Sequence, residues 1–246
     1  MKKISLALLL LGGILSSVRA KSIKIAVVSG IPPYVYYDDN RQLTGFDIDV
    51  GKEISKRIGY DIEYSEMGFD AIIPSVESGR VDVVASALTI TSTRAQKVDF
   101  SIPYLQSDEN DTIMVLKDNK NINALKDLKG KKVGCVVGAV QCDTLEKIGG
   151  VEIVHHTNTN DTYLSLLTKK IDANLEPSSS HGVCMKSICK DKVKIVGEAV
   201  PGGQVGAAVK KGNKELLNKI NKAIETMKRD GTLEKITLKY GFKYKI

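Results

Sequence analysis

The sequence has little of what metal and phosphate sites commonly need. It contains three histidines, and two of them, His155 and His156, are adjacent, so on a strand their side chains would point to opposite faces. It contains no phosphate-binding glycine loop. These absences argue against a zinc site and against nucleotide binding, and we expect no metal and no cofactor.

A strong excess of charge of one sign is also missing. Lys and Arg number 36 against 29 Asp and Glu. Lys2, Lys3 and Arg19 lie in the first twenty residues, which hold no acid, and 36 less these three leaves 33 basic residues, an excess of +4. With 42% hydrophobic residues the chain can bury a core, which excludes an acidic or low-complexity disordered polymer.

Only one long apolar run is present, and it lies at the N-terminus. Lys2 and Lys3 precede an apolar stretch from Ile4 to Leu15, which is shorter than the roughly 20 residues of a membrane-spanning helix. Val18-Arg19-Ala20 then fits a signal peptidase site, and no cysteine follows the run as a lipid attachment point. Residues 1–20 are therefore predicted to be a cleaved signal peptide of a periplasmic protein.

All four cysteines lie in the second half of the chain, at Cys135, Cys142, Cys184 and Cys189. An even number of cysteines in an exported chain favours disulfides over metal binding. Three connectivities are possible, and the sequence does not choose among them. The short loop after His181-Gly182 gives a preference for Cys184 with Cys189.

Short apolar runs alternate with helical patterns, which is typical of an α/β fold whose sheets are mostly parallel. In the helix expected over 46–58, apolar residues recur every four positions, with Thr44 as its predicted cap and Gly59 as its end. The other predicted helices cover 70–77, 141–148, 161–168 and 214–240, the last broken at Gly231. The predicted strands cover 23–28, 61–64, 81–85, 132–137, 151–155 and 171–175, and a polar hairpin-like loop covers 38–40.

Two segments resemble one another at equivalent places in the two halves. Residues 78–86 and 168–176 each place a basic residue, a β-branched residue and an Asp at the start of a strand that follows a helix. This likeness suggests two lobes of similar build.

The segment after the strand 81–85 has an anion-binding composition. Residues 86–94 contain several hydroxyl side chains and end at Arg94. In doubly wound sheets, ligands sit beyond the carboxyl ends of the strands. A guanidinium can hold a carboxylate by two parallel hydrogen bonds while Ser and Thr hydroxyls take the remaining lone pairs. A capped helix start with a surface arginine is the alternative.

The C-terminal helical segment carries many lysines opposite an apolar stripe formed by Leu216, Leu217, Ile220, Ile224 and Met227. A basic helix face can bind nucleic acid. In an exported chain the simpler interpretation is a solvated helix face, and we expect no nucleic-acid partner.

Several short motifs together resemble the extracellular solute-binding proteins of polar-amino-acid ABC transporters. They occur in the right order and spacing over nearly all of the residues after the signal peptide. The matching residues are Gly45-Phe46-Asp47-Ile48-Asp49-Val50, Phe69-Asp70-Ala71-Ile72-Ile73-Pro74, Val81-Asp82, Thr89-Ile90-Thr91 with Arg94, Leu128-Lys129-Gly130-Lys131-Lys132-Val133-Gly134 and Asp230-Gly231-Thr232.

The resemblance implies an α/β clamshell of the periplasmic-binding-protein type, in which two lobes, each a mostly parallel sheet flanked by helices, close around a free amino acid. Lobe 1 would comprise residues 21–107 and 206–246, and lobe 2 residues 108–205 with hinge strands at its ends. The resemblance also implies a monomer that delivers its ligand to a membrane permease, and no catalysis.

The resemblance further implies a set of ligand contacts. Arg94 would bind the α-carboxylate with help from Thr89, and Ser86 with the backbone near Ala87 would approach the α-amino group. Phe69 would pack on the ligand side chain, and Glu176 would face the α-amino cation. The predicted ligand-binding residues are Phe69, Ser86, Ala87, Leu88, Thr89, Arg94, Ala139, Val140, Gln141 and Glu176, with 139–141 opening a helix whose N–H groups help to hold the carboxylate.

Two departures from the family pattern concern the amino group and the side chain. The family's usual acid falls one residue later, where this chain has Pro177, so Glu176 would act from a shifted position. Members that bind basic amino acids often have an acid after the first strand, where this chain has Val28-Ser29-Gly30-Ile31. With Val136, Val137, Ala139 and Val140 opposite, the side-chain end is expected to be apolar. A basic ligand would need Glu66, Glu176 or another acid to reach in, because an unpaired buried cation is costly.

Two other functions remain open at this point. The same clamshell is used by an exported cyclohexadienyl or arogenate dehydratase, in which Glu176 would serve as the cleft acid because burial would raise its pKa. A sensory or structural exported domain is the third possibility. Which amino acid binds is not determined by the sequence.

Overall fold

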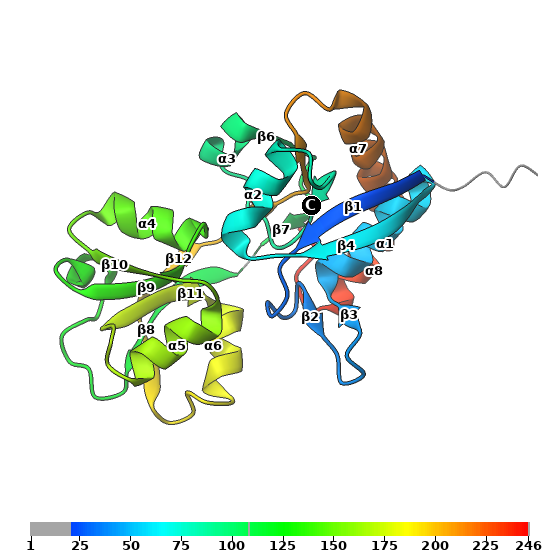
Figure 1. Ribbon diagram of the computed structural model, residues 1–246. Helices are drawn as coiled ribbons and strands as arrows, with labels where there is room; N and C mark the ends of the chain where they lie inside the picture. Colours follow the sequence, from blue (N-terminus) through cyan, green and yellow to red (C-terminus); the bar gives the residue numbers. More distant parts are fainter. Residues whose placement is uncertain (1–20, 108, 246) are drawn as a thin grey trace, which may run out of the picture.

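The computed structural model describes residues 21–107 and 109–245. It consists of two bodies side by side, each built on a sheet of its own, which we call lobe 1 and lobe 2 (Figure 1). The predicted signal peptide lies outside the described residues. Among the helices that are described, none is long and apolar enough to cross a membrane.

Lobe 1 contains a five-stranded sheet in the order β4-β1-β5-β14-β6. Its strands are β4 (Tyr60–Glu66), β1 (Lys21–Val27), β5 (Val83–Val84), β14 (Ala208–Lys210) and β6 (Val98–Phe100). Its helices are α1 (Phe46–Ile58), α2 (Phe69–Glu77), α3 (Ser92–Lys97), α7 (Lys214–Arg229) and α8 (Thr232–Lys239), and a hairpin joins β2 (Tyr36–Tyr37) to β3 (Leu43–Thr44). Both ends of the described chain thus contribute to one lobe.

Lobe 2 contains the second five-stranded sheet, in the order β10-β9-β11-β8-β12. Its strands are β10 (Glu152–His156), β9 (Lys132–Val136), β11 (Ala173–Pro177), β8 (Asn110–Leu116) and β12 (Val193–Pro201). The helices α4 (Val140–Ile148), α5 (Thr159–Leu167) and α6 (Ser178–Met185) pack around it, with a 3-10 turn at Leu125–Leu128.

In each sheet four strands run in one direction and one strand is reversed. β4, β1, β5 and β6 share one direction and β14 runs against them, while β10, β9, β11 and β12 share one direction and β8 runs against them. The reversed strand in each lobe is the one that enters from the other lobe, and it therefore meets the sheet from the opposite end. The sheets are mixed rather than wholly parallel, while the predicted α/β class is confirmed.

Two short strands, β7 (Leu105–Gln106) and β13 (Gln204–Val205), pair with each other where the chain passes between the lobes. Gly202 allows this close approach, because a Cβ there would lie 2.1 Å from the carbonyl oxygen of Glu109. The residue boundaries predicted for the lobes remain a proposal.

The two segments that resemble one another in sequence, residues 78–86 and 168–176, form the same pair of hydrogen bonds in their lobes. Asp82 accepts a hydrogen bond from the Lys24 N–H at 2.8 Å, and Asp172 accepts one from the Lys132 N–H at 2.9 Å. The N–H of Asp82 in turn donates to the carbonyl of Lys24, as that of Asp172 does to Lys132. In each lobe this reciprocal pair of bonds ties the start of one parallel strand to its neighbour.

The two ends of α1 can be compared with the predicted start at Thr44 and the predicted end at Gly59. Gly59 ends α1 in the left-handed conformation, as predicted, with φ 74°. The prediction that Thr44 caps the start of α1 is wrong, because Gly45 holds that place without a side-chain bond. Gly45 has φ 131°, and a Cβ there would lie 2.1 Å from the Tyr34 carbonyl oxygen, so only glycine fits.

Both disulfides join cysteines that are close in sequence. Cys135 pairs with Cys142 across 5.6 Å between Cα atoms, and Cys184 pairs with Cys189 across 5.1 Å. The preference for Cys184 with Cys189 is confirmed. His155 Nδ1 lies 3.7 Å from the Cys142 sulfur, but sulfur atoms joined in a disulfide are not thiolate ligands for a metal.

Candidate functional site

A cavity of about 400 Å³ lies between the lobes. Its walls come from the segments that follow the carboxyl ends of the parallel strands in both lobes, and from the two chain segments that cross between them. This is where doubly wound sheets place their ligands, and the volume lies within the range of small-molecule sites.

The lobe 1 wall is built on the turn after β5, which a buried carboxylate holds in place. Asp47 accepts a hydrogen bond from the Ala87 N–H at 2.6 Å and another from the Tyr104 hydroxyl at 2.6 Å. Ala87 has φ 48°, a strained value for a residue with a Cβ. Burial raises the pKa of Asp47 to about 6, and its two donors partly oppose that rise. The turn is thus fixed from behind, and Ala87 and Thr89 line the cavity.

Arg94 lines the cavity from α3 and is 8% exposed. Its Nη1 donates to the Thr89 carbonyl at 2.8 Å, and its Nη2 donates across the lobes to the Gly138 carbonyl at 2.9 Å. Burial lowers its pKa to about 10, so the guanidinium stays charged at neutral pH. Its further N–H donors are available to an anion.

Phe69, the first residue of α2, lies beside this guanidinium. The ring centroid is 5.6 Å from the Arg94 Cζ, a cation–π distance. Next to it the lobes touch, because a Cβ added at Gly138 would lie 3.1 Å from the Cα of Asp70. Phe69 therefore covers one face of Arg94 at the point where the lobes meet.

The lobe 2 wall includes the start of α4. Ala139, Val140 and Gln141 all line the cavity, and no side chain caps the helix at Ala139. The positive end of the helix dipole therefore faces the space beside Arg94. Asp111 fixes the Gln141 side chain, whose Nε2 donates to Oδ1 at 2.7 Å.

Glu176 lies at the end of β11 and is 3% exposed, and it lines the cavity. Its Oε1 is buried without a hydrogen-bond partner. Burial first, and then the negative charge of Asp111, raise the pKa of Glu176 to about 8. A buried acceptor that lacks a donor is what an ammonium group would satisfy.

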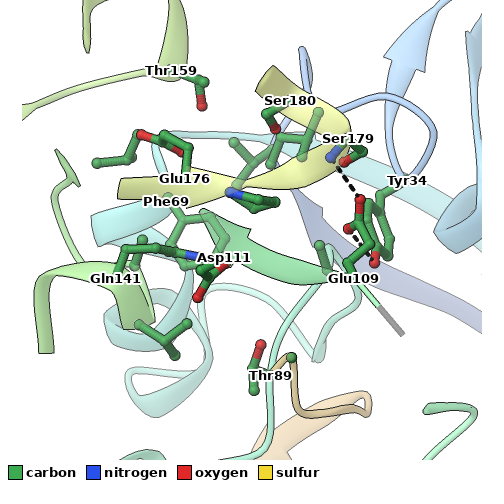
Figure 2. Close-up of a pocket in the computed structure, with 18 of the residues that line it drawn as sticks. Tyr34, Phe69, Thr89, Glu109, Asp111, Gln141, Thr159, Glu176, Ser179 and Ser180 are labelled. Carbon is green, nitrogen blue, oxygen red and sulfur yellow. Dashed lines mark hydrogen bonds between the residues drawn. The ribbon is translucent and has the colours of Figure 1, made fainter. Parts of the chain in front are cut away.

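Sequence reasoning missed two acids of the wall, Glu109 and Asp111. Glu109 Oε2 accepts from the Tyr34 hydroxyl at 2.9 Å, and Oε1 accepts from the Ser179 N–H at 3.2 Å (Figure 2). A signal was present, since Ser107, Glu109 and Asp111 alternate along an extended segment and so share one face. All three line the cavity.

Most of the predicted ligand residues meet in this cavity, but two do not line it. Ser86 is fully buried, and its hydroxyl accepts from the Val28 N–H at 2.9 Å, while Leu88 is fully buried in the lobe 1 core. Glu66, considered as an acid that could reach in, is exposed and bonds to the Tyr37 hydroxyl instead. The predicted residues that do line the cavity are Phe69, Ala87, Thr89, Arg94, Ala139, Val140, Gln141 and Glu176.

His181 stands behind the site rather than in it. The ring forms two hydrogen bonds. Its Nδ1 lies 2.7 Å from the Thr112 hydroxyl oxygen, and its Nε2 lies 3.2 Å from Asn174 Oδ1. Because an amide oxygen can only accept, Nε2 carries the proton and Nδ1 accepts from Thr112. Burial lowers the pKa of His181 to about 3, so the neutral ring serves as a structural bridge between β8, β11 and α6.

Two lobes around a partly polar cavity, with a buried arginine on one wall and a buried carboxylate with one unpartnered oxygen on the other, define a ligand-binding clamshell. Residues 23–243 match the family of bacterial extracellular solute-binding proteins, family 3, and the chain belongs to that family.

Similar proteins of known role are amino-acid-binding proteins. The L-cystine-binding protein TcyJ of Escherichia coli (strain K12) is 32% identical over 231 residues, 93% of this chain and 86% of that protein. The histidine-binding periplasmic protein of Salmonella typhimurium is 32% identical over 259 residues, 98% of this chain and 97% of that protein.

The solved structure of an ancestral arginine-binding protein bound to arginine has a TM-score of 0.82 and 40% identity, covering 89% of this chain and 98% of that chain. The solved structure of an ancestral arginine-binding protein bound to glutamine has a TM-score of 0.83 and 39% identity, covering 92% of this chain and 100% of that chain. This chain is accordingly an amino-acid-binding protein of the ABC-transporter type, and these relatives bind rather than transform their ligands.

Proposed function

We propose that this protein captures one free α-amino acid in the cavity between its lobes and delivers it to a membrane permease. The observation that carries the proposal is the pairing of opposite charges across one cavity. Arg94 stands on the lobe 1 wall, and Glu176, with its unpartnered Oε1, stands on the lobe 2 wall. An α-amino acid carries the two complementary charges on one carbon.

Arg94 is the proposed anchor of the α-carboxylate. Its two described bonds to backbone carbonyls fix the plane of the guanidinium and leave other donors for the ligand. The Thr89 hydroxyl and the N–H groups at the start of α4 are the proposed additional donors. Because Arg94 bonds to Gly138, a carboxylate held by Arg94 lies where the two lobes meet.

Glu176 is the proposed partner of the α-ammonium. An ammonium within hydrogen-bond distance supplies the donor that Oε1 lacks and offsets the cost of its buried charge. Asp111 adds negative potential on the same side, since its charge acts on Glu176.

Calorimetric titration of the purified protein with the common amino acids tests the proposed site. We expect at least one to bind with sub-millimolar affinity, and Arg94→Ala to lose about a hundredfold or more of it. Arg229→Ala is the matched control, because Arg229 is an exposed arginine of α7. Undiminished binding by Arg94→Ala would overturn the assigned carboxylate anchor.

Delivery to a permease and a periplasmic location are proposed from kinship. The family consists of extracellular solute-binding proteins, and one relative is named as periplasmic. Residues 1–20 are the proposed signal peptide, the proposed lobe boundaries are those given from the sequence, and the protein is proposed to act as a monomer. Mass spectrometry of the exported protein should give a chain that begins at Lys21, and deletion of the gene should abolish uptake of the bound amino acid.

A further inference from the structure

Acidic side chains outnumber basic side chains on the cavity wall. Three acids line it, Glu109, Asp111 and Glu176, and Arg94 is the one basic residue among the described residues that do so. An α-amino acid with a neutral side chain brings one carboxylate and one ammonium. These two groups pair with Arg94 and Glu176, which leaves Glu109 and Asp111 without a cation.

The two remaining acids lie together on the segment that crosses between the lobes. Ser107, Glu109 and Asp111 alternate along this extended segment, so their side chains share the face toward the cavity. Negative charge on Glu109 contributes to a pKa of about 6 for Asp111, after the larger effect of burial and against the hydrogen bond from Gln141. The two carboxylates thus act on each other electrostatically and line the same cavity.

Neighbouring groups hold both carboxylates in position. Tyr34 of lobe 1 and the Ser179 N–H of lobe 2 fix the Glu109 carboxylate from either side, while Gln141 fixes Asp111 (Figure 2). All these donors are neutral, so the bonds orient the two charges without cancelling them. A preorganised pair of acids in a cavity is a site for a cation.

Apolar side chains line the same cavity and suit an aliphatic stem. They are Val28, Ile31, Val136 and Val140. Of the residues expected at an apolar end, Val136, Ala139 and Val140 line the cavity and Val137 does not, so apolar side chains and acids share the lining. A long side chain with methylene groups and a charged tip matches that combination.

We infer that the bound amino acid has a side chain that ends in a cation, and that Glu109 and Asp111 form the subsite for that cation. The inference rests on the proposed function of the cavity. Glu109 and Asp111 would take the place of the acid expected after the first strand for a basic ligand, where this chain has Ser29 and Gly30.

Two other ligand classes fit the wall less well. An amide side chain brings no charge and leaves both carboxylates without a cation in the cavity. A ligand with a second amino acid group, such as a disulfide-linked dimer, brings a second ammonium, which the two acids can hold, but also a second carboxylate. No second basic side chain meets that carboxylate among the described residues of the wall.

The test compares L-arginine with L-citrulline, which has nearly the same shape and a neutral side chain. Calorimetry of the full protein should show about tenfold or more tighter binding of arginine. In Glu109→Gln and Asp111→Asn the affinity for arginine should fall while that for citrulline stays nearly constant, so the ratio moves toward one. Glu66→Gln, which alters an exposed acid outside the cavity, should keep the ratio of the unaltered protein.

The outcomes separate this inference from the proposed function. Tight binding of citrulline, glutamine or cystine with no preference for arginine would overturn the cation subsite while the amino-acid site stands. A preference for arginine that persists unchanged in both variants would also overturn it. If no amino acid binds, or Arg94→Ala binds as the unaltered protein does, the proposed site itself fails.

Discussion

The guanidinium of Arg94 in lobe 1 donates a hydrogen bond of 2.9 Å to the carbonyl oxygen of Gly138 in lobe 2. The residue proposed to hold the ligand therefore also joins the two lobes. Gly138 has φ 80°, which favours glycine, and it lies against the backbone of Asp70. We expect this contact to couple occupation of the cavity to the approach of the lobes.

Substitution of Gly138 should weaken ligand binding by keeping the lobes apart. In Gly138→Ala the new Cβ would meet the Cα of Asp70 at 3.1 Å, tighter than an ordinary contact. We expect a loss of about tenfold in affinity by calorimetry. Gly59→Ala is the control, because Gly59 has φ 74° and open space around it, so it carries backbone strain without the lobe contact. Equal affinities of the two variants would contradict this account.

Loss of the Asp47 carboxylate should weaken both stability and ligand binding, whereas loss of its donor Tyr104 should weaken stability alone. Asp47→Ala leaves the Ala87 N–H and the Tyr104 hydroxyl unpaired, so we expect a loss of about 3 kcal/mol in the free energy of unfolding together with weaker ligand binding. Tyr104→Phe removes one donor and leaves the bond to Ala87. It should cost about 1 kcal/mol and spare the affinity. Urea denaturation and calorimetry measure the two effects, and weakened binding in Tyr104→Phe would show that the turn is not held through Ala87.

The two disulfides should affect stability alike and binding differently. They close loops of similar length, with sequence separations of 7 and 5, so removal of either pair by Ser substitution should cost about 2 kcal/mol. Only the Cys135–Cys142 pair brackets residues that line the cavity, Val136, Ala139, Val140 and Gln141. The double variant at 135 and 142 should therefore lose more affinity than the double variant at 184 and 189. The reverse order in calorimetry would contradict the prediction.

Ionisation of Glu176 should make the ligand-free protein less stable as the pH rises. Its pKa is about 8 in the fold and 4.5 as the reference for the unfolded chain, so between these values the folded state holds more protons. The free energy of unfolding then falls as the pH rises through that window. Glu176→Gln removes this loss, and we expect its melting temperature at pH 9 to exceed that of the unaltered protein by about 5 °C.

Proton release on ligand binding gives a second test of the ionisation of Glu176. A ligand ammonium favours the charged form of Glu176, so amino-acid binding near pH 7 should release a proton. Calorimetry in buffers of different ionisation enthalpy detects that release. Glu146→Gln alters an exposed acid of α4, and it should match the unaltered protein both in the pH dependence of its melting temperature and in proton release on binding.

If the stability of Glu176→Gln and that of the unaltered protein changed with pH in the same way, the raised pKa of Glu176 would be contradicted.

The periodicity of the sequence was enough to predict the α/β class and most of the regular elements. The spacing of Phe46, Val50 and Ile54 gave α1, and the basic face of 214–240 proved to lie opposite the buried stripe of α7, with the break at Gly231. These features depend on local patterns of apolar residues, which a sequence displays directly. The strands β6, β7, β8, β12, β13 and β14, and the helices α3 and α6, were not predicted.

What the sequence by itself determined is therefore the fold class, the family motifs, the Asp82 and Asp172 repeat and the basic group at Arg94. The tertiary structure alone decided which acids share the cavity. Glu109 and Asp111 lie at the start of β8 and Glu176 lies in β11, and their meeting depends on the antiparallel pairing of these two strands. It also removed Ser86 and Leu88 from the cavity lining, because burial depends on packing between segments far apart in the chain.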